Sequence, residues 1–373
     1  MITLNIVGDF FSPSLSGLRF GEELQQRLAE ADVNIVNFEG PVKAGSASPI
    51  IKSGPNIAQD ANAPEFLKNQ KFNVFSLANN HSMDYGVESL KKTTNCFSDS
   101  TWVGAGNVND AYRVKVVEVE NQKIGFLALT QYEFGVLAEA GKPGDMGAAW
   151  MGHPVVDELI VKAKQECDYL IVLPHAGLEY FELPLPELRV LYRHFITMGA
   201  DAVIAGHPHV PQPCDTYKGK PIAYSLGNFC FDEKCDKPLW RDGLLATLQI
   251  DGGEVRMHLS TVHFDAAARV VELSHDAALD KRLKVNQELM DDEQAYRKAV
   301  NARCLSMRSY YDMLMEMGGY NRLSFRRCLG YVKRSLTGKQ PKPEASHFVN
   351  CMRCEPHRWV LSRIYELDNS NSK

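Results

Sequence analysis

The chain has 373 residues, which is enough for one large domain and a smaller one. Its hydrophobic content of 45% and its charged content of 23% are typical of a soluble globular protein. The formal net charge of −5 gives no general case for nucleic-acid binding, and no apolar run of about 18 residues predicts a membrane span.

The N-terminus and the cysteines both favour a cytoplasmic protein. The first residues, MITLNIVGDFF, lack the positive segment and the cleavage site of a secretory signal. The nine cysteines are odd in number and scattered, so we expect reduced thiols and no disulfide framework. A peripheral partner of a membrane complex would have the same features.

Charge is distributed unevenly along the chain. Residues 281–373 hold 18 Lys and Arg against 10 Asp and Glu, whereas the first 280 residues hold 23 against 36. We therefore predict two parts with different surfaces, an acidic body over residues 1–280 and a basic segment over residues 281–373.

In chain order, apolar β-rich runs alternate with amphipathic helical patterns, which predicts an α/β fold. The predicted strands are Thr3–Val7, Val33–Phe38, Val74–Ala78, Lys123–Leu129, Tyr169–Pro174, Ala202–Ala205 and Ile222–Ser225. The predicted helices between them include Gly21–Ala31, Val155–Gln165 and Leu185–Met198.

The last third of the chain changes character. An antiparallel meander is predicted over Gly243–Ile250, Glu254–Phe264 and Arg269–Leu273, with a hairpin turn at Asp251-Gly252-Gly253. After about residue 280 the pattern becomes helical. We predict helices over Lys281–Glu316 and Ser324–Ser335, a loop over Thr337–Glu344 and a last helix through Tyr365.

Polar side chains follow every predicted strand of the first two thirds except Lys123–Leu129. In open α/β sheets, binding sites form at the carboxyl ends of strands, where the loops converge. The residues at these ends are Asp9, Asn37, Glu39, Asn79, Asn80, His81, His175, His207, His209 and Asn228. Independent turns would not be expected to collect carboxylates, amides and imidazoles at one edge, so the joint pattern indicates a site.

Taken singly, most of these residues have simpler interpretations. They are a helix cap or turn for Asp9, a solvated turn for Glu39, an Asx turn for Asn80 and a structural histidine for His175. His207 and His209 differ, because a Gly-His-Pro-His turn directs both rings to nearly the same volume. Oxygen and imidazole ligands without thiolate favour Mn, Fe or Zn, and two such ions activate water and bind a phosphoryl group.

Seven motifs support a family resemblance. They are Gly8-Asp9, NFEG at 37–40, LANNHSMDYG at 77–86, GAG at 104–106, PHAGLEY at 174–180, GADAVIAGHPHVPQ at 199–212 and YSLGNFCFD at 224–232. In this order they resemble the capsule-synthesis CapA/poly-γ-glutamate synthesis proteins, a branch of the calcineurin-like metallophosphoesterase superfamily. The resemblance implies a metallophosphatase-like αββα sandwich over residues 1–280, followed by an α-helical C-terminal extension.

The resemblance also implies roles for individual residues. One metal ion would bind Asp9, Glu39 and His209, and a second would share Glu39 and bind Asn80, His175 and His207. His81 would face the substrate and protonate the leaving oxygen, with Asp84 orienting its ring. The side chains of Asn37, Asn79, Glu179 and Asn228 would contact the ligands or the substrate.

Two departures bear on the number of metal ions. Phe11 stands where typical metallophosphoesterases have a metal-binding histidine, and Glu39 stands where they have a bridging Asp. The first metal site would therefore be one ligand short, which leaves one ion or two as open alternatives.

The implied activity is metal-dependent phosphoester hydrolysis linked to capsule or exopolymer synthesis, with a phosphorylated or polyanionic polymer as substrate. The alternatives are a γ-glutamyl amide hydrolase, a non-hydrolytic accessory protein that binds polymer or a phosphorylated intermediate, and a degenerate scaffold. The basic stretch Ser324–Leu336 would either dock on the acidic body or meet a capsule-synthesis complex, another acidic partner or a membrane surface. Cys351, Cys354 and His357 are either half of a zinc site or part of a helix that docks on the body.

Overall fold

The computed structural model describes residues 1–138, 145–317 and 345–370. They form two compact units. The first comprises residues 1–50 and 56–297, and the second comprises residues 51–55 together with the chain from residue 298 onward.

The first unit contains a nine-stranded sheet in the order β2-β18-β17-β16-β1-β3-β4-β5, with β15 also paired to β1. Its strands are β1 (Ile2–Phe11), β2 (Arg19–Phe20), β3 (Val33–Phe38), β4 (Val74–Ser76), β5 (Thr101–Val103), β15 (Asn228–Phe231), β16 (Asp242–Asp251), β17 (Glu254–Asp265) and β18 (Val270–Ser274). Strands β1, β3, β4 and β5 run parallel, whereas β16, β17 and β18 form the predicted antiparallel meander.

A second sheet has six strands in the order β13-β14-β12-β11-β8-β7. They are β7 (Lys115–Val119), β8 (Gln122–Thr130), β11 (Tyr169–His175), β12 (Ala202–Ile204), β13 (Cys214–Tyr217) and β14 (Lys220–Ala223). Strands β8, β11, β12 and β14 are parallel to their neighbours, so their carboxyl ends lie at one edge. A small third sheet contains β6 (Ala105–Asn107), β9 (Val136–Leu137) and β10 (Met146–Ala149).

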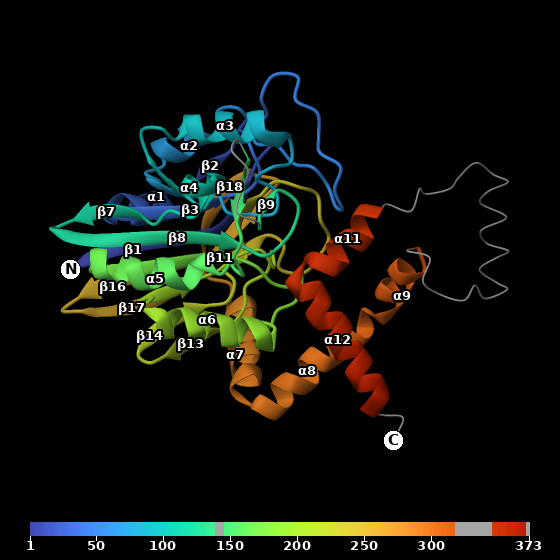
Figure 1. Ribbon diagram of the computed structural model, residues 1–373. Helices are drawn as coiled ribbons and strands as arrows, with labels where there is room; N and C mark the ends of the chain where they lie inside the picture. The colour runs from blue at the N-terminus through green and yellow to red at the C-terminus, as the bar shows by residue number, and fades with distance from the viewer. Residues whose placement is uncertain (139–144, 318–344, 371–373) are drawn as a thin grey trace. The chain divides into compact units, whose positions relative to one another are not determined.

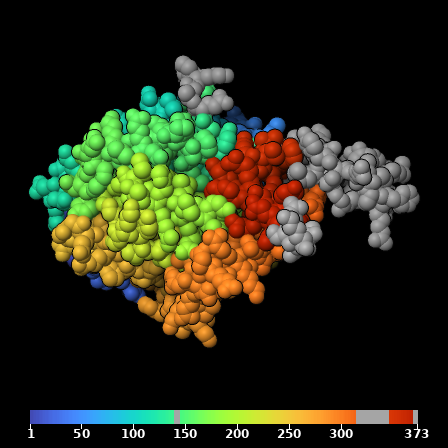
Figure 2. Space-filling model, turned by 60° about the horizontal axis from the view of Figure 1, so that its bottom comes forward, coloured from blue at the N-terminus to red at the C-terminus, as the bar shows by residue number. Residues whose placement is uncertain are grey.

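The two large sheets pack face to face between two layers of helices (Figure 1). The helices of the first unit are α1 (Glu22–Glu30), α2 (Ala63–Asn69), α3 (Gly86–Cys96), α4 (Val108–Ala111), α5 (Val155–Glu166), α6 (Pro186–Met198), α7 (Ala277–Asp291) and the start of α8 (Glu293–Ser306). Helices α1, α2 and α3 cover the nine-stranded sheet, and α5 and α6 cover the six-stranded sheet. Figure 2 shows α5 and α6 as a green to yellow-green surface.

Strand β1 shows why this sandwich forms. Ile2, Leu4 and Ile6 pack into the core between the sheets, whereas Val7 and Phe10 pack against the helical layer. A strand that is apolar on both faces has to be covered on both sides. Burying each such side chain stabilises the fold by about 1.5–3 kcal/mol. The predicted four-layer α/β fold is thus confirmed.

The C-terminal part is helical, as predicted, but its divisions differ. The predicted helix Lys281–Glu316 is divided among α7, α8 and α9 (Arg308–Met317). Asp292 ends α7 with an extended backbone, and its carboxylate accepts hydrogen bonds from the backbone amides of Gln294 and Ala295, which caps α8. The predicted helix Ser324–Ser335, the loop Thr337–Glu344 and the basic stretch Ser324–Leu336 lie outside the described residues.

The second unit also contains α11 (Ala345–Arg353) and α12 (Glu355–Ser370), which replace the single last helix that was predicted. Cys351 and Cys354 are buried here, and the Tyr311 hydroxyl lies 2.7 Å from Nδ1 of His357. The eight cysteines within the described ranges are present as thiols. In the same ranges, the helices are too short or too polar to cross a lipid bilayer.

Candidate metal centre

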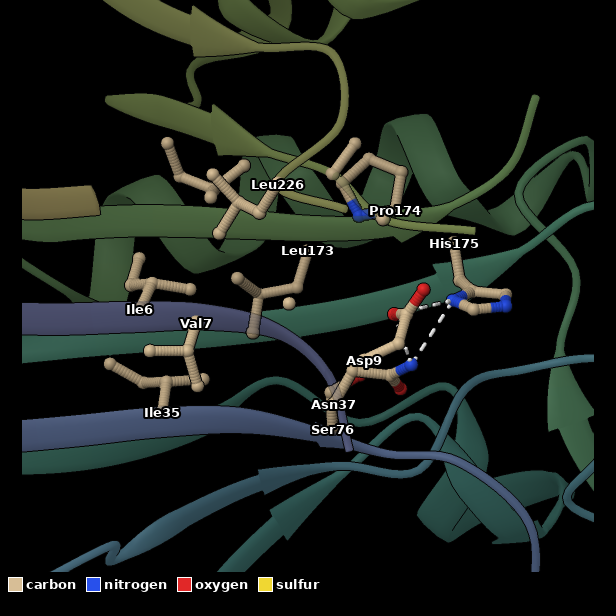
Figure 3. A pocket seen from close by; sticks show the side chains of 14 residues that line it. Ile6, Val7, Asp9, Ile35, Asn37, Ser76, Leu173, Pro174, His175 and Leu226 are labelled. Carbon is tan, nitrogen blue, oxygen red and sulfur yellow. Dashed lines mark hydrogen bonds and ion pairs between the residues drawn. The ribbon is translucent and has the colours of Figure 1, made fainter. Parts of the chain in front are cut away.

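The residues predicted at the strand ends meet at the edge where the parallel strands of both large sheets finish. Figure 3 shows Asp9 from β1, Asn37 from β3 and His175 from β11 pointing toward one another. The apolar side chains of Ile6 and Ile35 lie behind them and line a cavity of about 30 Å³. The polar cluster therefore lies at the end of the hydrophobic core between the sheets.

Gly8 allows Asp9 to reach the cluster. A Cβ atom at Gly8 would lie 1.8 Å from the carbonyl oxygen of Gly227, so only glycine fits this close approach. The Asp9 amide donates to that same oxygen at 3.1 Å. The approach aligns Asp9 with Asn228 of β15, and a register shift in β1 follows at Asp9 and Phe10.

Asn37 connects the two carboxylates to the imidazoles. Its Nδ2 lies 2.8 Å from Oδ1 of Asp9, 3.2 Å from Oε2 of Glu39 and 3.2 Å from Nδ1 of His175. Its Oδ1 accepts a hydrogen bond from Nδ2 of Asn79 at 3.1 Å. Asn37 and Asn79 thus hold the cluster together by amide hydrogen bonds.

The Glu39 carboxylate is fully buried among histidines. It lies 3.9 Å from Nε2 of His81, 3.9 Å from Nε2 of His175 and 3.9 Å from Nε2 of His209. Three imidazoles converging on one carboxylate at this distance leave room for a cation between them.

A second convergence involves the same nitrogen of His175. Its Nε2 lies 3.1 Å from Oδ1 of Asn80 and 3.1 Å from Nδ1 of His207. The backbone amide of His207 in turn lies 3.3 Å from Oδ2 of Asp9. One amide oxygen and two imidazole nitrogens therefore face a common volume.

His207 and His209 both adopt left-handed backbone conformations, with φ of 97° and 59°. Such conformations cost about 1–3 kcal/mol each for residues other than glycine. In return, the Gly-His-Pro-His turn places both rings in the cluster: Nδ1 of His209 lies 3.5 Å from Oδ2 of Asp9, and the His207 ring packs on His175.

His81 is held by Asp84, its predicted partner. Nδ1 of His81 lies 2.7 Å from Oδ2 of Asp84, which assigns the ring proton to Nδ1 and directs Nε2 toward Glu39. Asp84 is fully buried and also accepts from the Ile57 amide at 2.8 Å. Asn79 shapes the turn, because its Oδ1 accepts from the His81 amide at 3.2 Å.

An aromatic cluster surrounds the outer side of His209. The His209 ring lies 4.8 Å from that of Phe231 and 5.1 Å from that of Trp240. Phe11 packs on Phe231 at 5.1 Å and is buried in the same cluster. Phe11, which was expected to leave the first metal site one ligand short, is thus part of an apolar wall.

Burial changes the charge of the cluster. It raises the pKa of Asp9 and lowers the pKa values of His175 and His209, in each case because the interior disfavours the charged form. Asp9 and Glu39 both lie at ion-pair distance from histidines. Two buried carboxylates beside imidazoles whose pKa values are lowered fit a divalent cation.

Ligand atoms of Asp9, Glu39 and His175 lie within 4.8 Å of one another. In the described part of the chain this is the one such group of histidine, cysteine and carboxylate side chains, so Cys351, Cys354 and His357 do not form another. The donor set of oxygen and imidazole atoms suits Mn, Fe or Zn.

The comparison with protein families matches residues 16–233 to the model described as "Bacterial capsule synthesis protein PGA_cap". These residues include nearly all of the cluster. The chain belongs to this family. The prediction of CapA-type membership is therefore confirmed.

Two curated relatives each match about half of the chain. The chain is 34% identical over 216 residues to "Capsule biosynthesis protein CapA" of Bacillus anthracis, covering 55% of this chain and 52% of that protein. It is 34% identical over 202 residues to "PGA biosynthesis protein CapA" of Bacillus subtilis (strain 168), covering 53% and 52%. The chain thus spans about half the length of these relatives.

A solved structure of lower similarity is the 5'-nucleotidase from Candida albicans SC5314. It has a TM-score of 0.42 and 11% sequence identity, and the match covers 80% of this chain and 58% of that one.

Two further residues of this PGA_cap chain bear on the site. Glu179, expected to contact ligands or substrate, is exposed in the loop after β11, and its role stays a prediction. Gln131 was not predicted, yet it is buried and its Nε2 lies 2.9 Å from Nε2 of His207. Strand β8 runs one residue beyond the predicted end at Leu129, and extending it to Thr130 would have brought the Gln131 amide to the same edge.

Proposed function

We propose that the chain is a metal-dependent hydrolase that cleaves a phosphoester during the synthesis of a capsule or exopolymer of the poly-γ-glutamate type. The observation that carries the proposal is the buried group of Asp9, Glu39 and His175 beside the His81–Asp84 pair. The polymer class follows from the family and from the printed names of the relatives.

The proposed ligand sets follow the two convergences. Asp9, Glu39 and His209 would hold one ion, and Glu39, Asn80, His175 and His207 would hold another. A divalent ion held there supplies a lowered pKa for a bound water molecule and neutralises charge on a phosphoryl group. Asn37 would keep Asp9 and Glu39 in place through its amide hydrogen bonds, and Asn228 would orient His209, whose Nδ1 lies 2.9 Å from Oδ1 of Asn228.

His81 is the proposed general acid. Its Nδ1 donates to Asp84, so the buried carboxylate orients the ring and keeps Nε2 directed into the cluster. In this arrangement Nε2 carries the proton that is given to the leaving oxygen. A positioned acid of this kind contributes about 10²–10⁴ in rate.

The test uses metal-loaded full-length protein and a set of chromogenic substrates. Hydrolysis of a phosphodiester that is lost in His81→Ala, with metal content unchanged, supports the proposal. Hydrolysis of a γ-glutamyl anilide alone would favour the amide hydrolase. If the metal is bound and neither substrate is cleaved, the hydrolase proposal is wrong.

An accessory role is the second candidate, and Phe11 favours it. The apolar ring at this position leaves the Asp9–His209 side with fewer ligands than typical metallophosphoesterases have, which fits polymer binding without turnover. Recovery of capsule-synthesis enzymes by the full chain, and loss of that recovery on deletion of residues 281–373, would support this role.

A further inference from the structure

Gln59 is a buried residue of the loop between β3 and α2, and no role was predicted for it. Its side-chain Nε2 donates to the carbonyl oxygen of Phe10 at 2.8 Å and to that of Glu39 at 2.9 Å. Its Oε1 accepts from the backbone amide of Ser12 at 3.0 Å. One side-chain amide therefore joins the strand that carries Asp9 to the backbone of Glu39.

These three contacts also assign the orientation of the Gln59 amide. The Ser12 backbone amide can only donate, and the carbonyl oxygens of Phe10 and Glu39 can only accept. A flipped amide would set donor against donor at Ser12 and acceptor against acceptor at both carbonyl oxygens. The side chain thus uses its oxygen and both of its N–H groups to hold two segments of backbone together.

The cross-link replaces one step of the parallel ladder between β1 and β3. Phe10 lies opposite Phe38, and the next amide, that of Glu39, donates to the Phe10 carbonyl oxygen at 3.0 Å. In a regular parallel ladder the following bond would join the Ser12 amide directly to the Glu39 carbonyl oxygen. Here the Gln59 amide stands between these two groups and bonds to each. The two strand ends are therefore held apart by the width of one amide group.

The backbone of Gln59 is itself anchored to the loop that follows β3. Its amide donates to the carbonyl oxygen of Pro41 at 3.0 Å, and it forms an isolated β-bridge with Val42. Two residues earlier, Ile57 packs so closely on Gly40 that a Cβ atom there would lie 2.9 Å from Cγ1 of Ile57. The inserted amide is therefore supported from behind by a fixed segment.

The place of the insertion matters because Asp9 and Glu39 supply the two buried carboxylates of the cluster. Glu39 is one methylene longer than the Asp that typical metallophosphoesterases have at this position, so its carboxylate reaches further from the backbone. A direct bond between Ser12 and Glu39 would draw the Glu39 backbone toward β1 and shift its carboxylate relative to that of Asp9. The inserted amide prevents this approach.

We infer that Gln59 is a positioning residue that sets the separation of the Asp9 and Glu39 carboxylates by inserting its amide between β1 and β3. The consequence for metal affinity rests on the proposed metal-dependent function, whereas the insertion itself does not. Replacing residues that orient metal ligands changes affinity about 10- to 100-fold. We expect an effect of this size, because Gln59 bonds to the backbone of the proposed shared ligand.

The first experiment tests the insertion in the metal-free full chain. Amide hydrogen exchange measured by NMR reports whether the Ser12 amide is protected, as its bond to Gln59 requires. We expect slow exchange in the wild-type protein and exchange about tenfold faster or more in Gln59→Met, which has a similar length and no donor. A Ser12 amide that is unprotected in the wild-type protein, or equally protected in both proteins, overturns the inference.

The second experiment measures metal binding by the full chain. In calorimetric titration we expect folded Gln59→Met to bind Mn²⁺ about 10- to 100-fold more weakly than the wild-type protein. The d–d absorption bands of the Co²⁺-loaded protein report ligand geometry rather than stability, and we expect them to shift in the variant. Wild-type Mn²⁺ affinity or wild-type Co²⁺ bands in the folded variant contradict the inference.

Asn34→Leu is the matched control, because Asn34 is a buried amide at the other end of β3. Its Nδ2 donates to the carbonyl oxygens of Leu28 at 2.8 Å and Lys71 at 3.1 Å. The variant therefore loses similar hydrogen bonds away from the carboxylates and should keep the wild-type Mn²⁺ affinity and Co²⁺ bands. Equal loss of affinity in the two variants would indicate general destabilisation and would overturn the inference.

If Gln59→Met does not fold, Gln59→Glu takes its place, because it keeps the length of the side chain and the acceptor for Ser12 and loses the donor. Its Mn²⁺ affinity and Co²⁺ bands then decide in the same way. If the wild-type chain binds neither ion, the proposed metal-dependent function fails, while the exchange rate of the Ser12 amide still decides whether Gln59 holds the strand ends apart.

Discussion

The loops that carry His81 and His207 place the same kind of side chain at the same buried cluster, but they prepare it differently. His81 is paired with a carboxylate at 2.7 Å, whereas His207 faces an amide donor at 2.9 Å. The first arrangement places a carboxylate against the ring nitrogen, whereas the second places an uncharged amide there. The comparison teaches that the chemistry available at each position depends on more than the histidine itself. It depends on the side chain that contacts Nδ1 of His81 or Nε2 of His207.

The largest effect is expected from truncating each ring in turn. His81→Ala should lower kcat by about 10²–10⁴ and leave the metal content unchanged, because the proposed acid is lost and the ligands remain. His207→Ala should lower both kcat and the metal content, because it removes a proposed ligand. Steady-state kinetics measures kcat and elemental analysis measures the metal content of both variants. Equal loss of metal in the two variants would contradict the different roles proposed for His81 and His207.

Gly8→Ala tests the close contact between Gly8 and Gly227 that places Asp9 in the cluster. A Cβ atom 1.8 Å from the Gly227 carbonyl oxygen forces the two segments apart, so we expect a loss of about 3 kcal/mol or more in the free energy of unfolding. Urea denaturation measures the loss. Gly21→Ala is the control, because its Cβ atom would meet only the Glu272 side chain and backbone at 3.0 Å or more, and a loss of the same size there would contradict the account.

Asp84→Asn sharpens the comparison at His81. An amide at this position still accepts from the Ile57 backbone, but it removes the carboxylate charge beside Nδ1 of His81. We expect kcat to fall about 10- to 100-fold with little change in KM or metal content. A variant with unchanged kcat would show that Asp84 only supports the loop.

The variant Phe11→His tests whether the apolar ring at position 11 limits metal binding by Asp9 and His209. An imidazole at this position adds a ligand, so we expect calorimetry to detect tighter Mn²⁺ binding, with a loss of about 1–3 kcal/mol in stability from altered packing. Phe11→Leu is the control, since it changes the packing without adding a ligand. Equal Mn²⁺ affinity in the two variants would mean that Phe11 is not the limiting residue.

The smallest effect is expected at a half-exposed pair with the same chemistry as His81 and Asp84. Nδ1 of His263 lies 2.8 Å from Oδ1 of Asp242, and this hydrogen bond raises the pKa of His263 above its ordinary value of 6.5. The stabilisation is therefore complete below pH 6.5 and is lost as the pH rises through the folded-state pKa.

His263→Gln should thus cost about 0.5 kcal/mol at acidic pH, with the magnitude reduced by solvent exposure, and nearly nothing at alkaline pH. Urea denaturation at the two pH values measures the difference. A larger cost at alkaline pH would have the wrong sign for this linkage.

Much of the cluster could be predicted because each ligand follows an apolar strand directly. The strand Val33–Phe38 was predicted with its observed bounds, and the polar residues after it are where the prediction placed them. The parallel pairing of β15 with β1 could not be predicted, because it depends on the contact between Gly8 and Gly227, which are far apart in sequence.

Gln131 shows a different limit. The predicted strand ends at Leu129, one residue before the end of β8, so the Gln131 amide was not counted among the residues at strand ends. Glu179 shows the converse, since its place in a motif did not reveal that its side chain is exposed. The break between α7 and α8 lies at Asp292, whose carboxylate caps α8, and this local signal is hidden in a continuous helical pattern.

The most direct test of the account is the metal content of the untagged full-length protein. It is measured by elemental mass spectrometry after dialysis against Mn²⁺ and then against buffer, for the wild-type chain and for His175→Ala. The account predicts at least one divalent ion per wild-type chain and its loss in the variant. A wild-type chain that retains no metal would contradict the central claim that this cluster is a metal centre.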